Sequence, residues 1–384
     1  MKIILKFILF ISFPSFVFSQ NLPKDTIYGK VKSIKEKMLY LKKKQTIQEK
    51  VESDDFNSFY DNDYGEFGIM NPDWTRSDLK NIWFSSEFTK FINYEKSIDS
   101  LGNTLFEIWY DKKNNFVKAF KYLYDKKNRI IQSVDSTKYG NYTVNHYFED
   151  YDDIVVENII SEDIEDNRFK HTFKQYQNKK LVRTKMFNEY GDVEEFVNYY
   201  NEKGKLDFTI HKNPNSWKKI DNNSWSYGVH DTIIKSYKTK KFSYNENDKL
   251  IAIREYGLKD YTDSIELIKT TDYQYESGNL VYMHENNFSN YTPYFYYKYD
   301  KNNKLIERYC CDKDIKKAKI IRKYKYKDSK ISKLIYSENV KSSDMKTYDI
   351  SFTYKFDSKN NWIEIIKIVD GEKLYKWIRE IEYY

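Results

Sequence analysis

Cysteine, glycine and proline are all scarce in this chain of 384 residues. Eleven glycines and five prolines exclude the collagen-like and linker-like classes, which need far more of both. Two cysteines exclude a framework of structural disulfides, so sheet hydrogen bonds and packing must hold the fold. The two are adjacent, Cys310 and Cys311, and neighbours on a strand point to opposite faces. We therefore expect two partly buried thiols, in preference to a vicinal disulfide or a metal site.

Motifs that carry catalysis or cofactor binding are also missing. The sequence contains no glycine-rich phosphate loop, no G-x-S-x-G turn and no H-E-x-x-H pair. Its five histidines are scattered without the spacing of metal ligands. The acidic stretch 54–66 offers oxygen ligands of the kind calcium takes, but its glycine falls one position early for an EF-hand loop, which favours a solvated loop. We expect no enzymatic activity and no catalytic, cofactor-binding or metal-binding residues.

A long hydrophobic run is absent after the first twenty residues. Lys2 and Lys6 flank and interrupt a short apolar run that is followed by Pro14 and the small residue Ser19. This pattern is typical of a secretory signal peptide over residues 1–19, cleaved after Ser19. No later stretch has the ~18 to 20 apolar residues of a membrane helix. We expect a secreted protein in the periplasm or at the cell surface, without a membrane span.

Charge of one sign is only slightly in excess. The formal net charge of +7 comes from 65 basic and 58 acidic residues, and it does not predict nucleic-acid binding. The densest basic segment runs from 313 to 333, where lysines alternate with Tyr324 and Tyr326. Such a segment suits binding of anionic polysaccharide, lipid headgroups or nucleic acid, or it is a strand whose wet lysine face discourages aggregation. We favour the second, structural explanation.

Aromatic side chains and one short recurring pattern are abundant. Tyrosine occurs 38 times and phenylalanine 25 times, which is enough for an ordered core. The pattern is an aromatic residue, then Asp, Asn or Glu, two variable residues, then Gly, Asn or Asp, one variable residue and an apolar residue. Its eight copies begin at residues 110, 124, 148, 187, 200, 244, 299 and 356. Three copies that are one residue shorter begin at residues 176, 275 and 326.

This pattern has the chemistry of a β-hairpin turn. Its second residue can accept a hydrogen bond from the backbone two residues on, and its fifth needs a positive φ, which Gly, Asn and Asp tolerate best. A type I turn followed by a left-handed residue in a bulge meets both demands. We predict a structural role in turns for Asp111, Asn114, Asp125, Asn128, Asn188, Gly191, Asn201, Gly204, Asn245, Asp248, Asp300, Asn303, Asp357 and Asn360.

The residues on either side of the turns alternate as strands do. Segments 120–124 and 354–356 alternate aromatic with other side chains, so one face is a Tyr and Phe ladder and the other is largely lysine. We predict an all-β fold, an antiparallel β-hairpin repeat array over residues 106–384 that forms a twisted or partly curled sheet. Residues near 211–235 form an insertion in it. Residues 20–105 form a small N-terminal cap with one short helix over 76–84.

The pattern resembles the YD repeat of the Rhs and teneurin class. Residues 200–206, YNEKGKL, are closest to the Tyr-Asp-x-x-Gly-Arg/Lys-Leu form, and the similarity covers about residues 106–384. The resemblance implies long antiparallel sheets of hairpins that curl into a shell, in some members around a C-terminal toxin. This chain departs from the class because Asn or Asp usually replaces the glycine. Its last copy begins at Phe356, and we expect no toxin domain after it.

A functional hypothesis follows from the fold and the compartment. We expect a non-catalytic binding or scaffold protein of the cell envelope, which binds a protein or glycan partner through its tyrosine-rich face or its loops. One alternative is a secreted polysaccharide hydrolase, which requires a cleft with two convergent carboxylates. The other is a component of a toxin or immunity system, which requires a cognate partner.

Overall fold

The computed structural model describes residues 26–42, 80–89, 93–110, 114–137, 140–163, 168–188, 193–213, 215–219, 225–229, 235–258, 264–287, 294–338 and 345–384. These residues include one helical turn over 80–83 and 24 strands. The strands are β1 (Val31–Tyr40), β2 (Asn93–Ile98), β3 (Thr104–Tyr110), β4 (Phe116–Tyr124), β5 (Ile130–Thr137), β6 (Gly140–Tyr151), β7 (Ile154–Asp163), β8 (Arg168–Gln177), β9 (Lys180–Asn188), β10 (Val193–Tyr200), β11 (Leu206–Asn213), β12 (Asn215–Lys219), β13 (Trp225–Val229), β14 (Lys235–Tyr244), β15 (Leu250–Leu258), β16 (Ile265–Glu276), β17 (Asn279–Asn287), β18 (Tyr294–Tyr299), β19 (Leu305–Cys310), β20 (Lys319–Lys327), β21 (Lys330–Glu338), β22 (Lys346–Phe356), β23 (Trp362–Val369) and β24 (Glu372–Tyr383).

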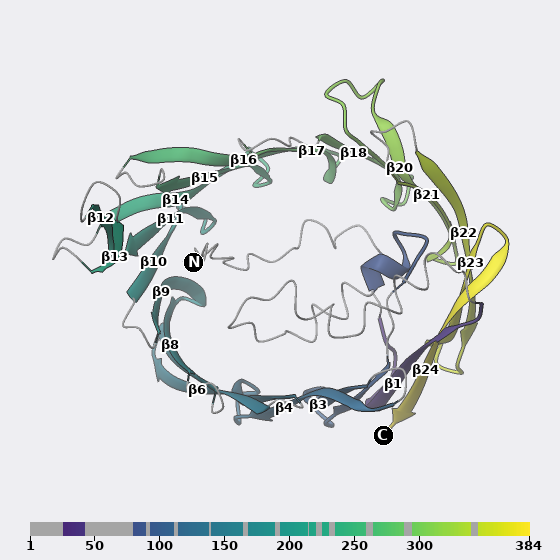
Figure 1. Ribbon diagram of the computed structural model, residues 1–384, viewed down its shortest axis with the longest axis horizontal. Coiled ribbons are helices and arrows are strands. Elements are labelled where there is room, and N and C mark those ends of the chain that lie inside the picture. Colours follow the sequence, from purple (N-terminus) through teal and green to yellow (C-terminus); the bar gives the residue numbers. More distant parts are fainter. Residues whose placement is uncertain are drawn as a thin grey trace.

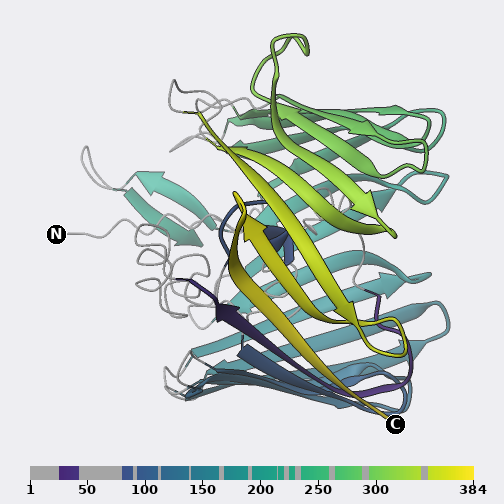
Figure 2. The ribbon, with the colours of Figure 1, turned by 90° about the vertical axis from the view of Figure 1, so that its right-hand side faces the viewer.

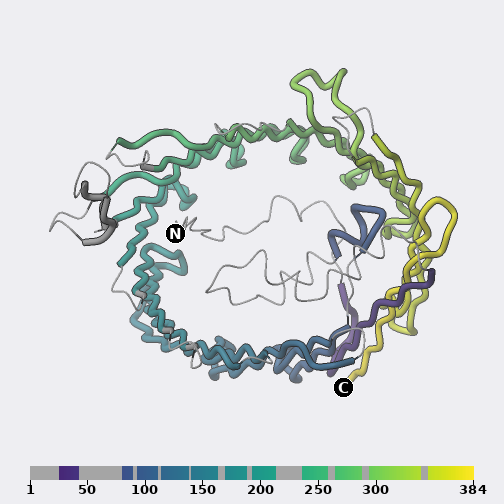
Figure 3. The backbone as a smooth tube through the Cα atoms, viewed as in Figure 1, coloured from purple at the N-terminus to yellow at the C-terminus, as the bar shows by residue number. Residues whose placement is uncertain are grey.

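Twenty-two of these strands form one antiparallel sheet that closes on itself (Figures 1 and 3). Each strand pairs with the next along the chain, except that β11 pairs with β14. β24 then pairs with β1, from Val31 opposite Tyr383 to Tyr40 opposite Tyr375. The predicted twisted or partly curled sheet is therefore wrong in one respect, because the sheet is a closed ring. An open hairpin array exposes two edges of unpaired backbone groups, and closure pairs both of them.

The ring has two rims of different character (Figure 2). Because neighbouring strands are antiparallel, every second connection lies at the same rim. One rim holds the connection from β2 to β3 and the connections within the hairpins that begin with β4, β6, β8, β10, β14, β16, β18, β20 and β22. These connections are short, and we call this the turn rim. The opposite rim, which we call the loop rim, includes residues 311–318 between β19 and β20, which project from the ring (Figure 1).

Two parts of the chain depart from the regular hairpin order. β12 and β13 pair with each other as a separate two-stranded sheet, inserted between the paired strands β11 and β14. This hairpin lies in the region 211–235. From the region 20–105, β1 and β2 belong to the ring, and residues 80–89, which we call the inner segment, lie inside it (Figures 1 and 3). Among the described residues, no helix is long and apolar enough to cross a membrane.

The turns at the turn rim follow local backbone chemistry. Asp125 Oδ1 accepts the main-chain N–H groups of Lys127 and Arg129 at 2.8 and 2.9 Å. The fifth motif residue in this turn, Asn128, has φ 58. Equivalent side-chain acceptors are Asn201, Asn245, Asp300 and Asp357, and equivalent positive-φ residues are Gly204, Asp248, Asn303 and Asn360. Asn114 has φ 68 at the loop rim, whereas Asp111, Gly191 and the side chain of Asn188 lie outside the described residues.

One further copy escaped the sequence pattern. Asp99 Oδ1 accepts from the N–H groups of Leu101 and Asn103 at 2.8 Å each, and Gly102 has φ 93. Ile98 stands where the pattern has an aromatic residue and Thr104 where it has an apolar one, so the pattern does not identify this copy. The three shorter copies are two-residue turns with both central residues at positive φ, as in type I′ turns: Asn178 and Lys179, Ser277 and Gly278, and Asp328 and Ser329.

The motif tyrosine has a role that the pattern did not reveal. The Tyr200 hydroxyl donates to the main-chain carbonyl of Leu181 at 2.8 Å, and Leu181 closes the previous turn on the same rim. The same bond, at 2.7 to 2.9 Å, joins Tyr124 to Thr104, Tyr244 to Leu206, Tyr299 to Leu280 and Tyr326 to Leu305. Each of these hairpins is thus tied to its predecessor. This bond explains why the first residue of the motif is tyrosine in these copies rather than a large apolar residue without a hydroxyl group.

Gly204 tests the backbone explanation of the turns. We expect Gly204→Val to destabilise the protein by about 2 kcal/mol, because a β-branched residue resists a φ of 74. A Cβ would also meet the flexible side chain of Lys180, which can move aside. Gly204→Asn is expected to cost less, since Asn adopts this conformation more readily. Urea unfolding midpoints of both variants measure the difference, and equal losses would contradict the explanation.

The inner segment identifies which face of the sheet lines the ring. Trp83 packs against Phe352 of β22 and against Tyr375 and Trp377 of β24. Residues paired across antiparallel strands share a face, so the pairings carry this assignment around the ring. We call this face luminal. It holds much of the core, including Met38, Tyr94, Trp109, Phe120, Tyr273, Met283, Tyr297, Tyr324, Leu334, Ile350 and Ile365.

The outer face carries ion pairs between neighbouring strands. Glu364 lies 2.9 Å from both Lys355 and Lys376, and Glu307 lies 2.7 Å from Lys323. Such partly exposed pairs contribute only about 0 to 1 kcal/mol each. Their main consequence is that this face is charged and hydrated, while aromatic rings gather on the luminal face.

Candidate functional site

The luminal wall formed by β20 to β24 holds the inner segment. Lys367 Nζ donates to the main-chain carbonyl of Phe88 at 2.7 Å, and Arg322 Nε donates to that of Ser85 at 2.9 Å. Both acceptors belong to the backbone, so these contacts do not depend on the identity of the side chains at Phe88 and Ser85. Two cationic side chains of the wall therefore bind main-chain carbonyl groups of the inner segment.

Aromatic packing supplies the second half of this contact. Trp83 is fully buried, and its ring centroid lies 5.4 Å from that of Trp377 and 6.4 Å from that of Phe352. Phe84 lies 5.1 Å from Phe352 in the same way. Lys367 Nζ lies 5.4 Å from the Trp83 ring, within the range of a cation–π interaction. Rings from the segment and the wall thus enclose the same ammonium group.

The charges of Lys367 and Glu87 act on each other at this contact. Burial lowers the pKa of Lys367 well below its ordinary value, and the Glu87 carboxylate opposes that shift. Burial raises the pKa of Glu87, and Lys367 is among the groups that oppose it. Each charge reduces the cost of burying the other. The sequence does signal Lys367, because it is the lone charge in the apolar run 365–369.

A buried ion pair lies where β1 meets β24. Arg379 Nε lies 2.7 Å from Glu36 Oε1, and the two side chains are 1% and 2% exposed. Trp377 Nε1 donates to Glu36 Oε2 at 2.9 Å, and the Arg379 guanidinium lies 3.5 Å from the Trp362 ring centroid. Glu36 and Arg379 are 343 positions apart, so no local pattern identifies the pair.

The luminal wall of β2 to β5 carries further acid–base pairs. Lys96 Nζ lies 3.2 Å from Glu107 Oε1, and Lys118 Nζ lies 2.7 Å from Asp135 Oδ2. Burial raises the pKa of Asp135, and Lys118 acts against that rise. Charges at this depth are retained in proteins when each has a partner, as here.

Glu157 of β7 is the centre of a larger luminal group. His146 Nδ1 lies 2.8 Å from Glu157 Oε1, and the Tyr176 hydroxyl donates to Oε2 at 2.9 Å. Burial acts to raise the pKa of Glu157, but the hydrogen bonds and charges of His146, Lys174 and Tyr176 outweigh it and lower the pKa. The group is therefore arranged to keep Glu157 ionised.

We expect the buried His211 of β11 to make the stability of the protein depend on pH. Burial lowers its pKa from 6.5 to about 4, so between these values the unfolded chain binds a proton that the folded protein does not. His211 therefore does not reduce the free energy of unfolding above pH 6.5. Between pH 6.5 and about pH 4 it lowers this free energy progressively, by up to about 3 kcal/mol. We expect His211→Gln to remove this part of the loss. Urea midpoints at pH 7.5 and 4.5 measure it, with His171→Gln of β8 as control, and an unchanged pH dependence in the His211 variant would contradict the assignment.

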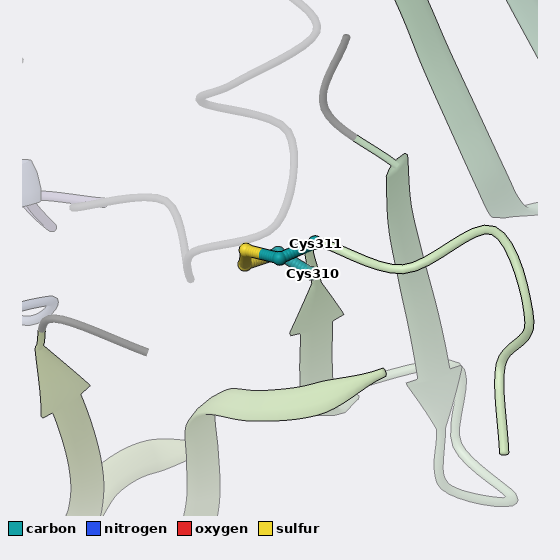
Figure 4. The surroundings of a disulfide bond; sticks show 2 residues. All are labelled: Cys310 and Cys311. Carbon is teal, nitrogen blue, oxygen red and sulfur yellow. A yellow bond between two sulfur atoms is a disulfide. The ribbon is translucent and has the colours of Figure 1, made fainter. Parts of the chain in front are cut away.

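Cys310 and Cys311 are joined by a disulfide, which corrects the expectation of two free thiols (Figure 4). That expectation assumed that both residues lie within a strand. β19 ends at Cys310, and Cys311 has φ 85, so the chain turns between them. The rule that neighbouring residues on a strand point to opposite faces therefore does not apply to Cys310 and Cys311.

The predicted turn residues do not converge on one place. Those described lie mainly along the turn rim, where neighbouring turns contact each other: Asn279 Nδ2 donates to Asn303 Oδ1 at 2.9 Å, and Lys203 Nζ to Asp248 Oδ1 at 3.0 Å. Within the described part of the chain, no three His, Cys, Asp or Glu side chains gather as a metal ion would require. The residues of the inner-segment contact were not predicted.

Comparison with known proteins assigns no family. No protein-family model matches the sequence, and no curated protein matches it. Among solved structures, one similar chain is that of TcdB2-TccC3 without its hypervariable C-terminal region, a crystal structure, at 10% identity and a TM-score of 0.24. The match covers 75% of this chain and 18% of that chain. Another is a porin-like protein from Bacteroides uniformis, at 8% identity and a TM-score of 0.21, covering 94% of this chain and all of that one.

Proposed function

We propose that this protein is a secreted, non-catalytic binding or scaffold protein of the cell envelope, built of YD-like hairpin repeats. The observation that supports it most is the contact between the inner segment and the luminal wall. There Lys367 and Arg322 donate to main-chain carbonyls while Trp83 packs among wall aromatics. A wall with this chemistry is suited to holding polypeptide.

The architecture supports a scaffold in a second way. Tyrosine hydroxyl bonds tie five of the hairpins to the one before them, and the closed sheet leaves no open edge in the ring. Luminal carboxylates such as Glu107, Asp135 and Glu157 are held in ion pairs with basic neighbours. These features favour a rigid support over a catalytic cleft.

Localisation in the source cells tests the proposal. We expect the mature chain to begin at Gln20 and to fractionate with the envelope, which N-terminal sequencing and quantitative peptide analysis measure. Protease treatment of intact cells, with a periplasmic protein as control, then separates the two compartments. Digestion of this protein alone places it at the cell surface, and survival of both places it in the periplasm. An uncleaved N-terminus in the cytosol would overturn the proposal.

A further inference from the structure

The stretch of chain that contains β18 to β21 has a larger net positive charge than the whole protein. Residues 294–333 contain twelve lysines and two arginines against five acidic residues, a net charge of +9, whereas the entire chain carries +7. The rest of the molecule is therefore slightly negative. We call the lysines of this stretch the basic patch. Its charges are concentrated on one wall of the ring and on the projecting residues 311–318 (Figure 1).

The two arginines of the stretch do not belong to the outer face. Arg308 and Arg322 are directly opposite each other in β19 and β20 and face the lumen, where Arg322 contacts the inner segment. Lys323, Lys325 and Lys327 alternate with them on the outside of β20. On a strand, alternate residues are spaced by about 7 Å, so these lysines form a row, in which Lys323 is paired with Glu307 at 2.7 Å while Lys325 and Lys327 are exposed.

We infer that the basic patch binds an anionic polysaccharide, a polymer with acidic groups repeated along its length. This inference deepens the proposed function, on which it rests for the compartment. A row of lysines offers evenly spaced point charges to such a polymer, whereas the bidentate recognition of phosphates favours arginine, which this face lacks among its described residues.

The aromatic and apolar groups of the patch favour the same ligand class. Tyr296 and Tyr309 are each only 9% exposed, and Tyr309 is held by Lys298 at 2.7 Å, so neither offers an open ring to stacked bases. Within residues 294–333, Ile315 is the large apolar side chain that is exposed, at 45%. One such residue on a convex wall provides little to insert into a bilayer.

Charge reversal with a matched control tests the inference. We use the full mature chain and polygalacturonate as the probe, at about 50 mM salt, where charge attraction is weakly screened. The test variant carries Lys317→Glu, Lys325→Glu and Lys327→Glu, all exposed. The control carries Lys121→Glu, Lys126→Glu and Lys179→Glu, exposed lysines near the opposite wall. Both variants change the net charge equally. Circular dichroism verifies that each one is folded.

We expect the test variant to bind at least about tenfold more weakly, the control to bind as the unsubstituted protein does, and binding to weaken as salt is raised. Equal losses in both variants would overturn the inference, because net charge alone would then explain binding. So would tighter binding to phosphatidylglycerol vesicles or to oligothymidylate, or no binding to polygalacturonate. A protein that is located in the envelope but does not bind polygalacturonate leaves the proposed function standing.

Discussion

Arg379→Met is expected to destabilise the protein by about 3 to 5 kcal/mol, because it leaves the buried Glu36 carboxyl group without its partner. The pair has 1% and 2% exposed side chains at 2.7 Å, and it joins the first strand of the ring to the last. Among the residues that the structure describes, Trp377 is then the one that still donates a hydrogen bond to Glu36. The midpoint of urea unfolding, followed by circular dichroism, measures the loss.

Two further variants separate the buried charge from the loss of packing. Glu36→Leu combined with Arg379→Met removes both charges and is expected to recover most of the stability, as is common when buried ion pairs are replaced by apolar residues. Lys355→Met removes an exposed lysine from its pair with Glu364, which keeps Lys376 at 2.9 Å, and is expected to cost no more than about 1 kcal/mol. If the double variant is no more stable than Arg379→Met, an uncompensated charge is not the cause.

Trp83→Ala is expected to release the inner segment from the wall while the ring stays folded. Trp83 is fully buried between Trp377, Tyr375 and Phe352, and removal of such a side chain costs about 3 to 5 kcal/mol. Since each 1.4 kcal/mol is a factor of ten, amide exchange over residues 80–89 should accelerate by at least about a hundredfold. Hydrogen exchange resolved by peptide mass measures it, and strands β22 to β24 serve as the internal reference.

A conservative variant and a surface variant define the specificity of this effect. Trp83→Phe keeps an aromatic ring in the site and is expected to retain most of the protection. Leu101→Ala changes a side chain that is 73% exposed and is expected to change nothing. Unaltered exchange over residues 80–89 in Trp83→Ala would show that the wall does not hold the segment through this ring.

The turns could be predicted from the sequence because their requirements are local. A positive φ at Asn128 or Asp248 is set by the residue itself and its immediate neighbours, so the same solution recurs wherever the pattern does. The alternation of Tyr324 and Tyr326 with Lys325 likewise separates two faces. Local pattern fails at Asp99, where an isoleucine replaces the leading aromatic residue and the turn is nevertheless made.

Closure and the luminal contact could not be predicted, because they depend on residues far apart. Alternation shows that two faces exist but not which one turns inward, and the pairing of β1 with β24 has no local signal. Lys367 was visible as a lone charge in an apolar run, yet its partner Phe88 lies 279 positions away. The disulfide could not be predicted for a related reason, because the sequence has no local signal for the end of β19 at Cys310.

The pairing of β1 with β24 also has a consequence for the order of folding. Almost every other contact in the ring joins strands that follow one another, which form quickly because little chain entropy is lost in closing short loops. β1 finds its second neighbour only after more than three hundred further residues have been made. We expect hairpins to add one by one to a growing curved wall, with the two ends meeting last. The inner segment lies between β1 and β2 in the chain, so we expect it to be enclosed as the wall grows around it, before the two ends meet.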